Sequence, residues 1–354
     1  MSMQTGLNRI GRVLGVAAAD LPVEGMLPSF DGASGWLNSQ PLMPSGLRGH
    51  VVVVQFWTYT CINWLRTQAY FRAWSQRYKD QGLVTIGVHT PEFKFEHDLD
   101  NVRWAVQARR IDYPVAVDND FAVWRAFANN YWPALYFVDS QGRIRHHRYG
   151  EGDYERSDMV IRQLLSDAGV EDLRPGLASV EPNADEVQAD WEDLGSPETN
   201  TGYDQATGFD AGSDGSAWDK PHAYAAPARL RLNHWGLSGN WTVRSDASAL
   251  NGPSGRVAYQ FHARDVNLVM GPARKGGTVR FRVLLDGGSA GPAHGADVDA
   301  DGHGTVVQQR MYQLIRQPGP IGDRTGRRGR EGCRSRFEIE FLDAGAEAFC
   351  FTFG

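Results

Sequence analysis

The 354-residue sequence contains few cysteines: Cys61, Cys333 and Cys350 are the only three, and they lie far apart along the chain. An odd number at such wide spacing excludes a framework in which every cysteine is paired within the chain. The sequence also has no Cys-x-x-Cys and none of the paired Cys/His spacings from which zinc sites are built. We therefore expect no metal site, and no motif points to a cofactor.

The sequence also lacks any run of about 18 apolar residues that could span a membrane. Its net charge of −6 provides no basic surface, which argues against nucleic acid as a partner. Residues 1–20 contain Arg9 and Arg12 before a short apolar run that Gly15 interrupts, which resembles a cleaved signal peptide only faintly. We interpret residues 1–20 as a short N-terminal arm, with the signal peptide as the alternative.

The composition is that of a soluble globular protein, with 42% hydrophobic and 22% charged residues, and the length suits two or three domains. Residues 21–170 alternate between apolar strands and helical patterns. The β-branched run over 51–57 predicts a strand that is buried on both faces. Such alternation is typical of an α/β sheet.

The pattern changes after residue 170. Residues 171–226 are acidic and rich in Gly, Pro, Ser and Asp, which favours a linker. Residues 227–354 then carry apolar side chains at every second position over several stretches, such as 257–263, 279–285 and 349–353. Period-two strands between glycine-rich turns predict an antiparallel β-sandwich.

The informative cysteine is Cys61, in the segment Trp57-Thr58-Tyr59-Thr60-Cys61-Ile62-Asn63-Trp64. This segment places Cys61 between the predicted buried strand and the first turn of a helix. Unpaired N–H groups and the helix dipole at such a position favour the thiolate, which is the nucleophile of disulfide exchange.

WTYTCINW after an apolar strand, followed later by the proline-led strand WPALYFVD, resembles the thioredoxin superfamily, in its TlpA-like redoxin branch. The segments GLVTIGVHTPEF and FEIEFLDAGAEAFCFTFG extend the resemblance, over residues 20–354, to the soluble region of DipZ-type cytochrome c biogenesis proteins. The resemblance implies an α/β thioredoxin fold followed by an all-β sandwich of jelly-roll type, similar to carbohydrate-binding modules. DipZ-type proteins also carry a membrane part for electron delivery, to which nothing in this sequence corresponds.

Carried over residue by residue, the resemblance implies that Cys61 is the attacking cysteine. Pro133 matches the proline whose cis peptide faces that sulfur, which would leave the backbone of Trp132 able to pair with an extended substrate. Glu92 matches a carboxylate that lies near the thiols and carries a proton, although a solvated turn residue is an equal alternative.

The sequence departs from the family at the second motif cysteine, where Trp64 stands. A Cys-x-x-Cys protein releases its mixed disulfide through the second thiol, and Trp64 has no such chemistry. Three outcomes stay open: an external thiol resolves the adduct, Cys61 reduces peroxide as a one-cysteine redoxin, or the fold persists without redox turnover. The spacing Thr58-x-x-Cys61 matches part of a peroxiredoxin motif, but Val54 stands where that motif has proline.

Aromatic and polar residues near the motif are candidate substrate contacts: Thr58, Tyr59, Thr60, Trp64 and Trp132. Packing within the fold is the alternative for the aromatic members, as it is for Trp57 and Tyr131.

Cys350 and Cys333 are resolving thiols only if the sandwich folds back on the first domain. The alternation around residue 350 places Cys350 opposite the row Phe349, Phe351 and Phe353, where packing in a strand is the simpler interpretation.

We therefore predict a monothiol thiol-disulfide oxidoreductase that acts through Cys61 on protein or small-molecule thiols, with an external resolving thiol. The alternatives are a one-cysteine peroxide reductase and a non-redox scaffold whose sandwich binds a glycan or an envelope protein. The resemblance implies a periplasmic or extracytoplasmic location, with the cytoplasm as the alternative.

Overall fold

The computed structural model describes residues 21–318 and 334–354 and divides into two compact units, residues 1–186 and 187–354. The N-terminal arm predicted for residues 1–20 and Cys333 lie outside the described residues. In the part that is described, no helix is long and apolar enough to cross a membrane.

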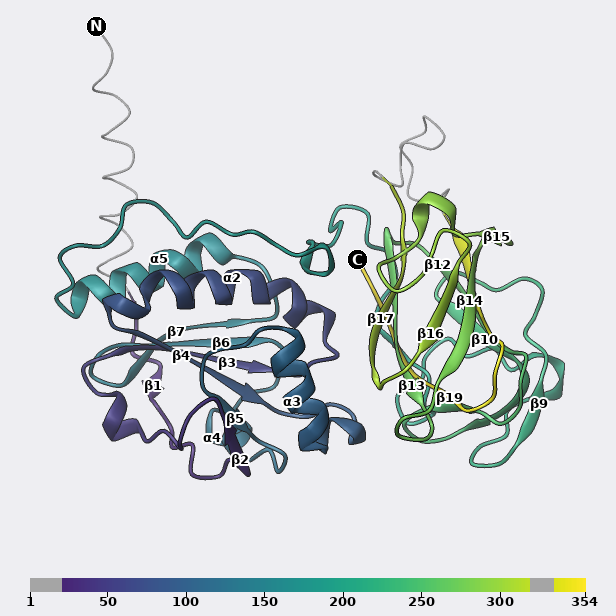
Figure 1. Cartoon of the computed structure of the whole chain (residues 1–354), viewed down its shortest axis with the longest axis horizontal. Helices are drawn as coiled ribbons and strands as arrows, with labels where there is room; N and C mark the ends of the chain where they lie inside the picture. Colours follow the sequence, from purple (N-terminus) through teal and green to yellow (C-terminus); the bar gives the residue numbers. More distant parts are fainter. Residues whose placement is uncertain (1–20, 319–333) are drawn as a thin grey trace, which may run out of the picture. The chain divides into compact units, whose positions relative to one another are not determined.

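The first unit is a mixed seven-stranded sheet with helices on both faces (Figure 1). The strand order is β1-β7-β6-β3-β4-β5-β2, with β3–β4 and β4–β5 parallel and the other pairs antiparallel. Its strands are β1 (Gly25–Met26), β2 (Gly35–Leu37), β3 (Val51–Trp57), β4 (Leu83–His89), β5 (Val115–Val117), β6 (Ala134–Val138) and β7 (Arg143–Tyr149). Its helices are α2 (Ile62–Tyr78), α3 (Leu99–Ala108), α4 (Ala122–Ala126) and α5 (Tyr154–Asp167).

Every residue of β3 is buried, as its unbroken apolar run predicts for a central strand. Helices α2 and α5 lie together on one face of the sheet (Figure 1), with α2 against β4 and α5 against β3 and β6. The other face packs Val54 and Phe56 against Val123 of α4 and against Phe127. The carboxyl end of β3, where the chain turns into α2, is thereby held between two packed layers.

The segment from 171 to 186, which we call the strap, belongs to the first unit rather than to a linker. Arg77 donates from one nitrogen to the carbonyls of Arg174, Pro175 and Gly176, at 3.1, 2.8 and 2.9 Å. At the end of the strap, Glu186 forms a two-pronged ion pair with Arg72 of α2, at 3.0 and 2.9 Å. Arginine side chains thus order a segment whose composition favours a loose chain.

The second unit begins at Val187, and residues 187–226 contribute two strands to it instead of a linker. All strand pairs in this unit are antiparallel, in the order β15-β14-β18-β12-β10-β11-β19-β13-β17 with β16, β8 and β9 alongside β14, β19 and β10. The strands are β8 (Thr199–Asn200), β9 (His222–Tyr224), β10 (His234–Val243), β11 (Ser248–Leu250), β12 (Gly255–Phe261), β13 (Asp265–Pro272), β14 (Val279–Leu285), β15 (Gly288–Ser289), β16 (His303–Val306), β17 (Arg310–Arg316), β18 (Ser335–Phe341) and β19 (Ala346–Phe353).

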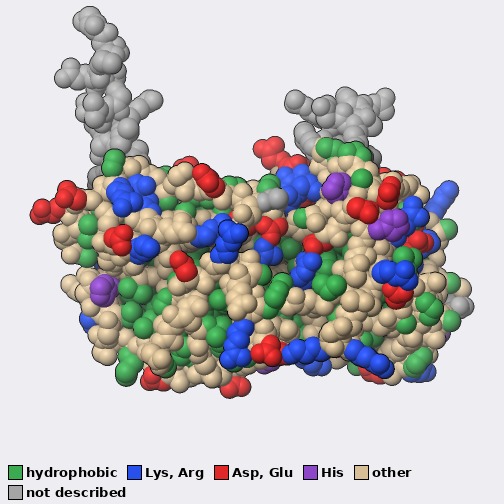
Figure 2. All heavy atoms as spheres, viewed as in Figure 1, with side chains coloured by type: hydrophobic (Ala, Val, Ile, Leu, Met, Phe, Trp, Pro, Cys, Tyr) green, Lys and Arg blue, Asp and Glu red, His purple; other side chains and the backbone are tan. Residues whose placement is uncertain are grey.

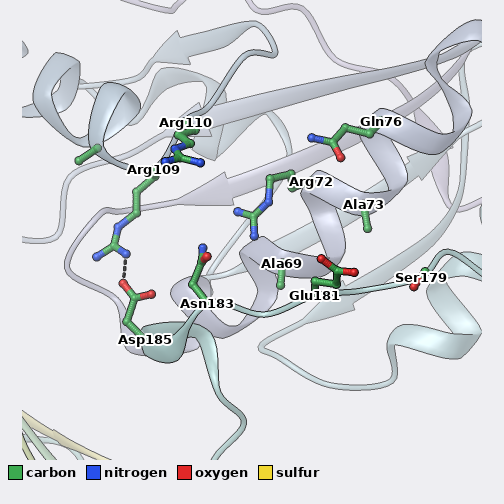
Figure 3. A pocket seen from close by; sticks show the side chains of 11 residues that line it. Ala69, Arg72, Ala73, Gln76, Arg109, Arg110, Ser179, Glu181, Asn183 and Asp185 are labelled. Carbon is green, nitrogen blue, oxygen red and sulfur yellow. Dashed lines mark hydrogen bonds and ion pairs between the residues drawn. The ribbon is translucent and has the colours of Figure 1, made fainter. Parts of the chain in front are cut away.

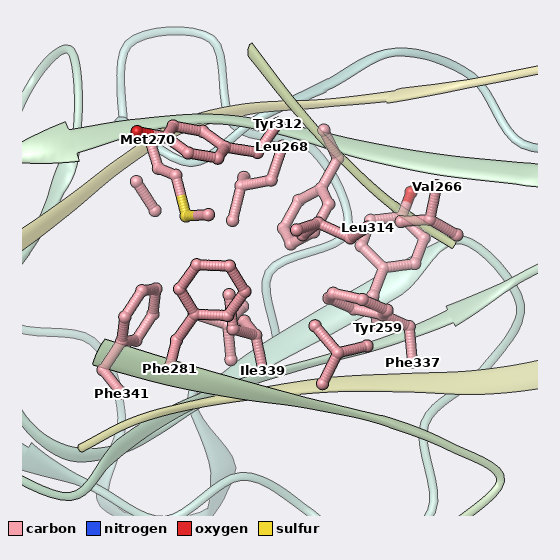
Figure 4. Close-up of a cluster of buried hydrophobic side chains, with 14 of the residues drawn as sticks. Tyr259, Val266, Leu268, Met270, Phe281, Tyr312, Leu314, Phe337, Ile339 and Phe341 are labelled. Carbon is pink, nitrogen blue, oxygen red and sulfur yellow. The ribbon is translucent and has the colours of Figure 1, made fainter. Parts of the chain in front are cut away.

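The core of the second unit lies between facing strands: Leu268 and Tyr312 approach from one side and Phe281 and Ile339 from the other (Figure 4). The alternating stretches predicted over 257–263 and 279–285 supply this core. An all-antiparallel β domain is therefore confirmed, whereas the jelly-roll and carbohydrate-binding likeness stays a prediction.

The predicted aromatic row at 349–353 is broken by a bulge in β19. Pairing with β13 shifts register so that Val269 faces Cys350 while Met270 faces Ala348. The extra residue moves Phe349 out of the core cluster that contains Phe351 and Phe353, because one inserted residue reverses the facing of a strand.

Space on the α2 side of the sheet is tight at Gly87, where an added Cβ would lie 2.8 Å from Nε1 of Trp57 and 3.1 Å from Cε2 of Tyr113. We expect Gly87→Ala to reduce the free energy of unfolding by about 1–3 kcal/mol through overpacking. Gly35→Ala is the control, because nothing lies within 4 Å of its added Cβ; it should be neutral or stabilising by about 0.4–1 kcal/mol. Urea denaturation read by hydrogen exchange of peptides from residues 51–89 separates the two, and equal effects would contradict the packing explanation.

Candidate functional site

Cys61 lies where the sequence predicts it, between β3 and α2. Its backbone is extended (φ −73°, ψ 116°), it occupies the N-cap position, and α2 begins at Ile62. The turn from β3 is closed by the N–H of Cys61, which donates to the carbonyl of Thr58 at 3.3 Å. The side chain of Cys61 is partly exposed. A sulfur at this position meets the positive end of the helix dipole.

The peptide bond between Trp132 and Pro133 is cis, as the resemblance implies. The Cys61 thiol donates to the carbonyl of Trp132, with a sulfur–oxygen distance of 3.8 Å. The indole of Trp132 is fixed by the ring of Trp124, 4.3 Å between centroids, and by a 3.0 Å hydrogen bond from Nε1 to the carbonyl of Thr90. The structure therefore brings Cys61 and the cis peptide together, while their catalytic roles stay a prediction.

Trp64 is fully buried and lies in the core instead of on the surface. Its ring stacks on Trp57 with centroids 4.5 Å apart and planes 19° apart, and its Nε1 donates to Oε1 of Gln55 at 3.2 Å. The indole thus occupies the position of the second motif thiol. Its contacts with Trp57 and Gln55 join the start of α2 to β3.

The expected proton carrier, Glu92, is exposed, and the buried carboxylate belongs to Glu96, four residues further along. Oε1 of Glu96 accepts a 2.7 Å hydrogen bond from Oγ1 of Thr60, the neighbour of Cys61. Oε2 accepts the backbone N–H groups of Glu92 and Phe93 at 2.7 and 2.9 Å. Burial raises the pKa of Glu96, and the hydrogen bonds donated to it oppose that rise.

Two rings below the turn complete the buried side of the site. His89, at the end of β4, lies edge-on to Trp57 at 4.8 Å and stacks with Tyr59 at 5.8 Å. His89 is fully buried, and neither ring nitrogen has a hydrogen-bond partner among the described residues. Burial lowers the pKa of His89 to about 3 and raises the pKa of Tyr59, so both rings are neutral at pH 7.

The predicted substrate contacts therefore separate into two groups. Thr58, Tyr59, Thr60 and Trp64 are buried, and only Trp132 is partly exposed. Tyr131, which precedes Trp132, and Tyr149 of β7 form an exposed aromatic pair. Tyr131 is 53% exposed, and its ring lies 4.8 Å from that of Tyr149, on the strand paired with β6.

Cys350 lies in β19 of the second unit, where it is 2% exposed and its thiol donates to the carbonyl of Phe351 at 3.4 Å. This placement matches packing in a strand. No group of three or more His, Cys, Asp or Glu residues within 21–318 and 334–354 is arranged to hold a metal ion.

A cavity of about 650 Å³ lies between α2, the end of α3 and the strap, and it does not include Cys61. Arg72, Arg109 and Arg110 border it, and Arg109 forms an ion pair with Asp185 across it (Figure 3). Arg72 is held by Glu186, so two of the three guanidinium groups already anchor the strap. On the molecular face drawn in Figure 2, basic and acidic side chains are interspersed, and no large patch of one charge is visible among the described residues.

Residues 24–147 match the AhpC/TSA family, and residues 196–354 match a family described as thioredoxin like C-terminal domain. The chain combines an AhpC/TSA-type thioredoxin-like domain with a thioredoxin-like C-terminal domain. The second family match begins inside the segment predicted as a linker, in agreement with the division of the structure at residue 187.

Among curated proteins, the chain is similar to Protein DipZ of Mycobacterium bovis and of Mycobacterium tuberculosis. Each is 36% identical over 279 residues, which is 76% of this chain and 38% of the DipZ protein. The chain thus spans less than half the length of these relatives. The thiol-disulfide oxidoreductase YkuV of Bacillus subtilis is 25% identical over 141 residues, 40% of this chain and 95% of YkuV.

Among solved structures, the chain is similar to a thioredoxin-like protein in its oxidized form, with 25% sequence identity and a TM-score of 0.38. The match covers 41% of this chain and 97% of the chain of that protein. The family matches and the similarity to DipZ confirm the resemblance expected from WTYTCINW and WPALYFVD: the chain is a thioredoxin-like redoxin related to DipZ.

The buried neutral state of His89 predicts a dependence of stability on pH. An unfolded histidine binds a proton near pH 6.5, whereas His89 in the folded chain does so only near pH 3. Its contribution is therefore complete above pH 6.5 and is lost on acidification, by up to about 1.4 kcal/mol per pH unit. We expect His89→Phe to show a shallower loss of unfolding free energy between pH 6.5 and 4 than the parent chain. Urea denaturation at each pH measures this, and parallel curves for the two proteins would contradict it.

Proposed function

We propose that this chain is a thiol-disulfide exchange protein that works through Cys61 alone and requires an external thiol to complete its cycle. The observation that carries the proposal is the pairing of a partly exposed N-cap thiol with the cis peptide at Pro133, while buried Trp64 fills the place of a second thiol.

The reaction proceeds in two balanced exchanges. The Cys61 thiolate attacks one sulfur of a substrate disulfide, so that a Cys61–substrate disulfide forms and the other substrate sulfur leaves as a thiolate. A thiolate from solution or from a second protein then attacks the substrate sulfur of this adduct. Cys61 leaves as a thiolate again, and the substrate sulfur is released as a mixed disulfide with the external thiol. A second equivalent of the external thiol then attacks this mixed disulfide, so that the two external thiols together supply the two electrons that reduce the substrate disulfide.

Trp132 and its surroundings support a polypeptide as the substrate. The carbonyl of Trp132 already lies next to the sulfur, and Tyr131, the preceding residue, forms an exposed aromatic pair with Tyr149. Such a surface suits the chain that flanks a substrate cysteine better than it suits a small thiol. The extracytoplasmic location implied by the resemblance to DipZ-type proteins belongs to the same proposal, as does any glycan or envelope ligand of the second unit.

Reaction with Ellman's reagent tests the single-thiol mechanism, in a background carrying Cys333→Ser and Cys350→Ala. We expect this protein to release one equivalent of thionitrobenzoate and to hold the other half as an adduct until an external thiol is added. Cys61→Ser should release none. Trp64→Cys should release a second equivalent without added thiol, because a second sulfur at the turn resolves the adduct.

Removal of the Trp64 indole leaves a cavity worth about 3–5 kcal/mol, so folding of Trp64→Cys is first checked by circular dichroism. The measurements on the parent protein and on Cys61→Ser test the proposal without the Trp64→Cys variant. Spontaneous loss of the adduct with Trp64 intact, or labelling that survives Cys61→Ser, would overturn the proposal. Peroxide consumption lost in Cys61→Ser, with no disulfide exchange in the parent, would favour the one-cysteine peroxide reductase instead.

Glu96 provides a second test, through its link to the cysteine turn by Thr60. A neutral amide at this position removes a negative charge near the developing thiolate. We therefore expect Glu96→Gln to move the pH profile of Cys61 alkylation by iodoacetamide to lower pH, by about one unit. Glu92→Gln is the matched control, because that side chain is exposed; equal profiles for Glu96→Gln and Glu92→Gln would remove Glu96 from the mechanism.

A further inference from the structure

The second unit carries an aromatic pair that the thiol chemistry does not use, the exposed Trp218 and the partly buried Tyr203. Trp218 is 43% exposed, and its ring lies 5.4 Å from that of Tyr203. Phe209 lies behind Trp218 at 6.0 Å and packs, with Tyr203, against the core of the unit. We call Trp218 and Tyr203 the aromatic platform; its rings are accessible to solvent on one side and rest on the packed core on the other.

The backbone fixes this platform at the end of β10. The N–H of Asp219 donates to the carbonyl of Val243 at 2.9 Å, and the N–H of Tyr203 donates to the carbonyl of Arg244 at 2.9 Å. Gly202 permits the close approach, because a Cβ at this position would lie 2.5 Å from Cα of Asp246. The two rings are thus held in place before any ligand arrives.

Three carboxylates act on Tyr203, and that of Asp219 is in direct contact with it. The hydroxyl of Tyr203 donates to Oδ2 of Asp219 at 2.8 Å. This hydrogen bond raises the pKa of Tyr203, and the charges of Asp204 and Asp246 add to the rise, so all three carboxylates act on the same ring. Arg244, the residue that follows β10, is paired with Glu347 at 2.8 Å.

Aromatic faces attract cations, and nearby carboxylates strengthen that attraction. We propose that Trp218 and Tyr203, with Asp204, Asp219 and Asp246, form a binding site for an alkylammonium group, presented by a lysine side chain of a partner polypeptide. A polypeptide fits the platform better than a free small cation, because the platform is open and small ligands bind in concave sites. This inference goes beyond the thiol exchange at Cys61 and does not depend on it.

The test uses the full chain and follows the indole N–H signal of Trp218 in 1H–15N spectra, assigned by its loss in Trp218→Phe. The probes are Nα-acetyl-lysine methylamide, its uncharged analogue Nα-acetyl-norleucine methylamide, and methyl glucoside. We expect a saturable shift with the lysine probe alone, with a dissociation constant on the order of millimolar that rises with salt.

Replacing an aspartate with asparagine keeps the shape of the site and removes one negative charge from it. Asp219→Asn and Asp246→Asn should each weaken lysine binding by about two- to fivefold, as expected for exposed cation–aromatic sites. Trp191→Phe is the matched control, since Trp191 is an exposed tryptophan of the same unit, at 55%, outside the cluster. Lys220→Ala, next in sequence to Asp219, should not weaken binding.

Three results with the probes would overturn the inference: an equal shift with the norleucine probe, a shift with methyl glucoside and none with lysine, or no shift with any probe. Unchanged lysine binding in both aspartate variants would also overturn it. Circular dichroism of each variant confirms that the fold is retained.

Discussion

The stacking of Trp64 on Trp57 is the constraint on which the arrangement at Cys61 depends. Trp57 is the last residue of the central strand β3, and Trp64 lies in the first turn of α2, so their contact joins the two elements that the Cys61 turn connects. Stacked aromatic rings contribute both buried area and a preferred geometry. The same contact fills the position at which a second motif thiol would stand, so the stability of the turn and the loss of a resolving thiol have one cause.

Much of the first unit follows from local sequence. The run Val51–Trp57 is a strand because its β-branched residues suit a doubly covered sheet, and the helix begins directly after Cys61 as predicted. The exposure of Glu92 matches the alternative of a solvated turn residue, and the buried carboxylate belongs to Glu96. The choice between two glutamates in one turn depends on which of them meets the donors of Thr60, Glu92 and Phe93, and those donors converge only after folding.

The region after residue 170 shows why composition alone misleads. Gly, Pro and Asp are frequent in linkers, and they are equally frequent in ordered loops whose hydrogen bonds come from other segments. Here the side chains of Arg72 and Arg77 on α2 supply the bonds of the strap, and β10 and β19 pair with β9 and β8. The bulge at Phe349 is a similar case. Alternation of apolar residues in a sequence does not show where one extra residue interrupts the pairing of two strands.

Under the single-thiol mechanism proposed above, the selection of partners takes place outside the motif. A second motif thiol removes any bound substrate quickly, so a Cys-x-x-Cys protein limits how long a wrong adduct persists. Without that thiol the lifetime of an adduct is set by the external thiol, and discrimination must occur before the disulfide forms. Contacts that hold a partner near Cys61, such as those at the aromatic pair Tyr131 and Tyr149, raise the effective concentration of its disulfide. Under the proposed mechanism, buried Trp64 and the exposed pair Tyr131 and Tyr149 belong to one requirement, because a chain that cannot release its own adducts must choose its partners by binding.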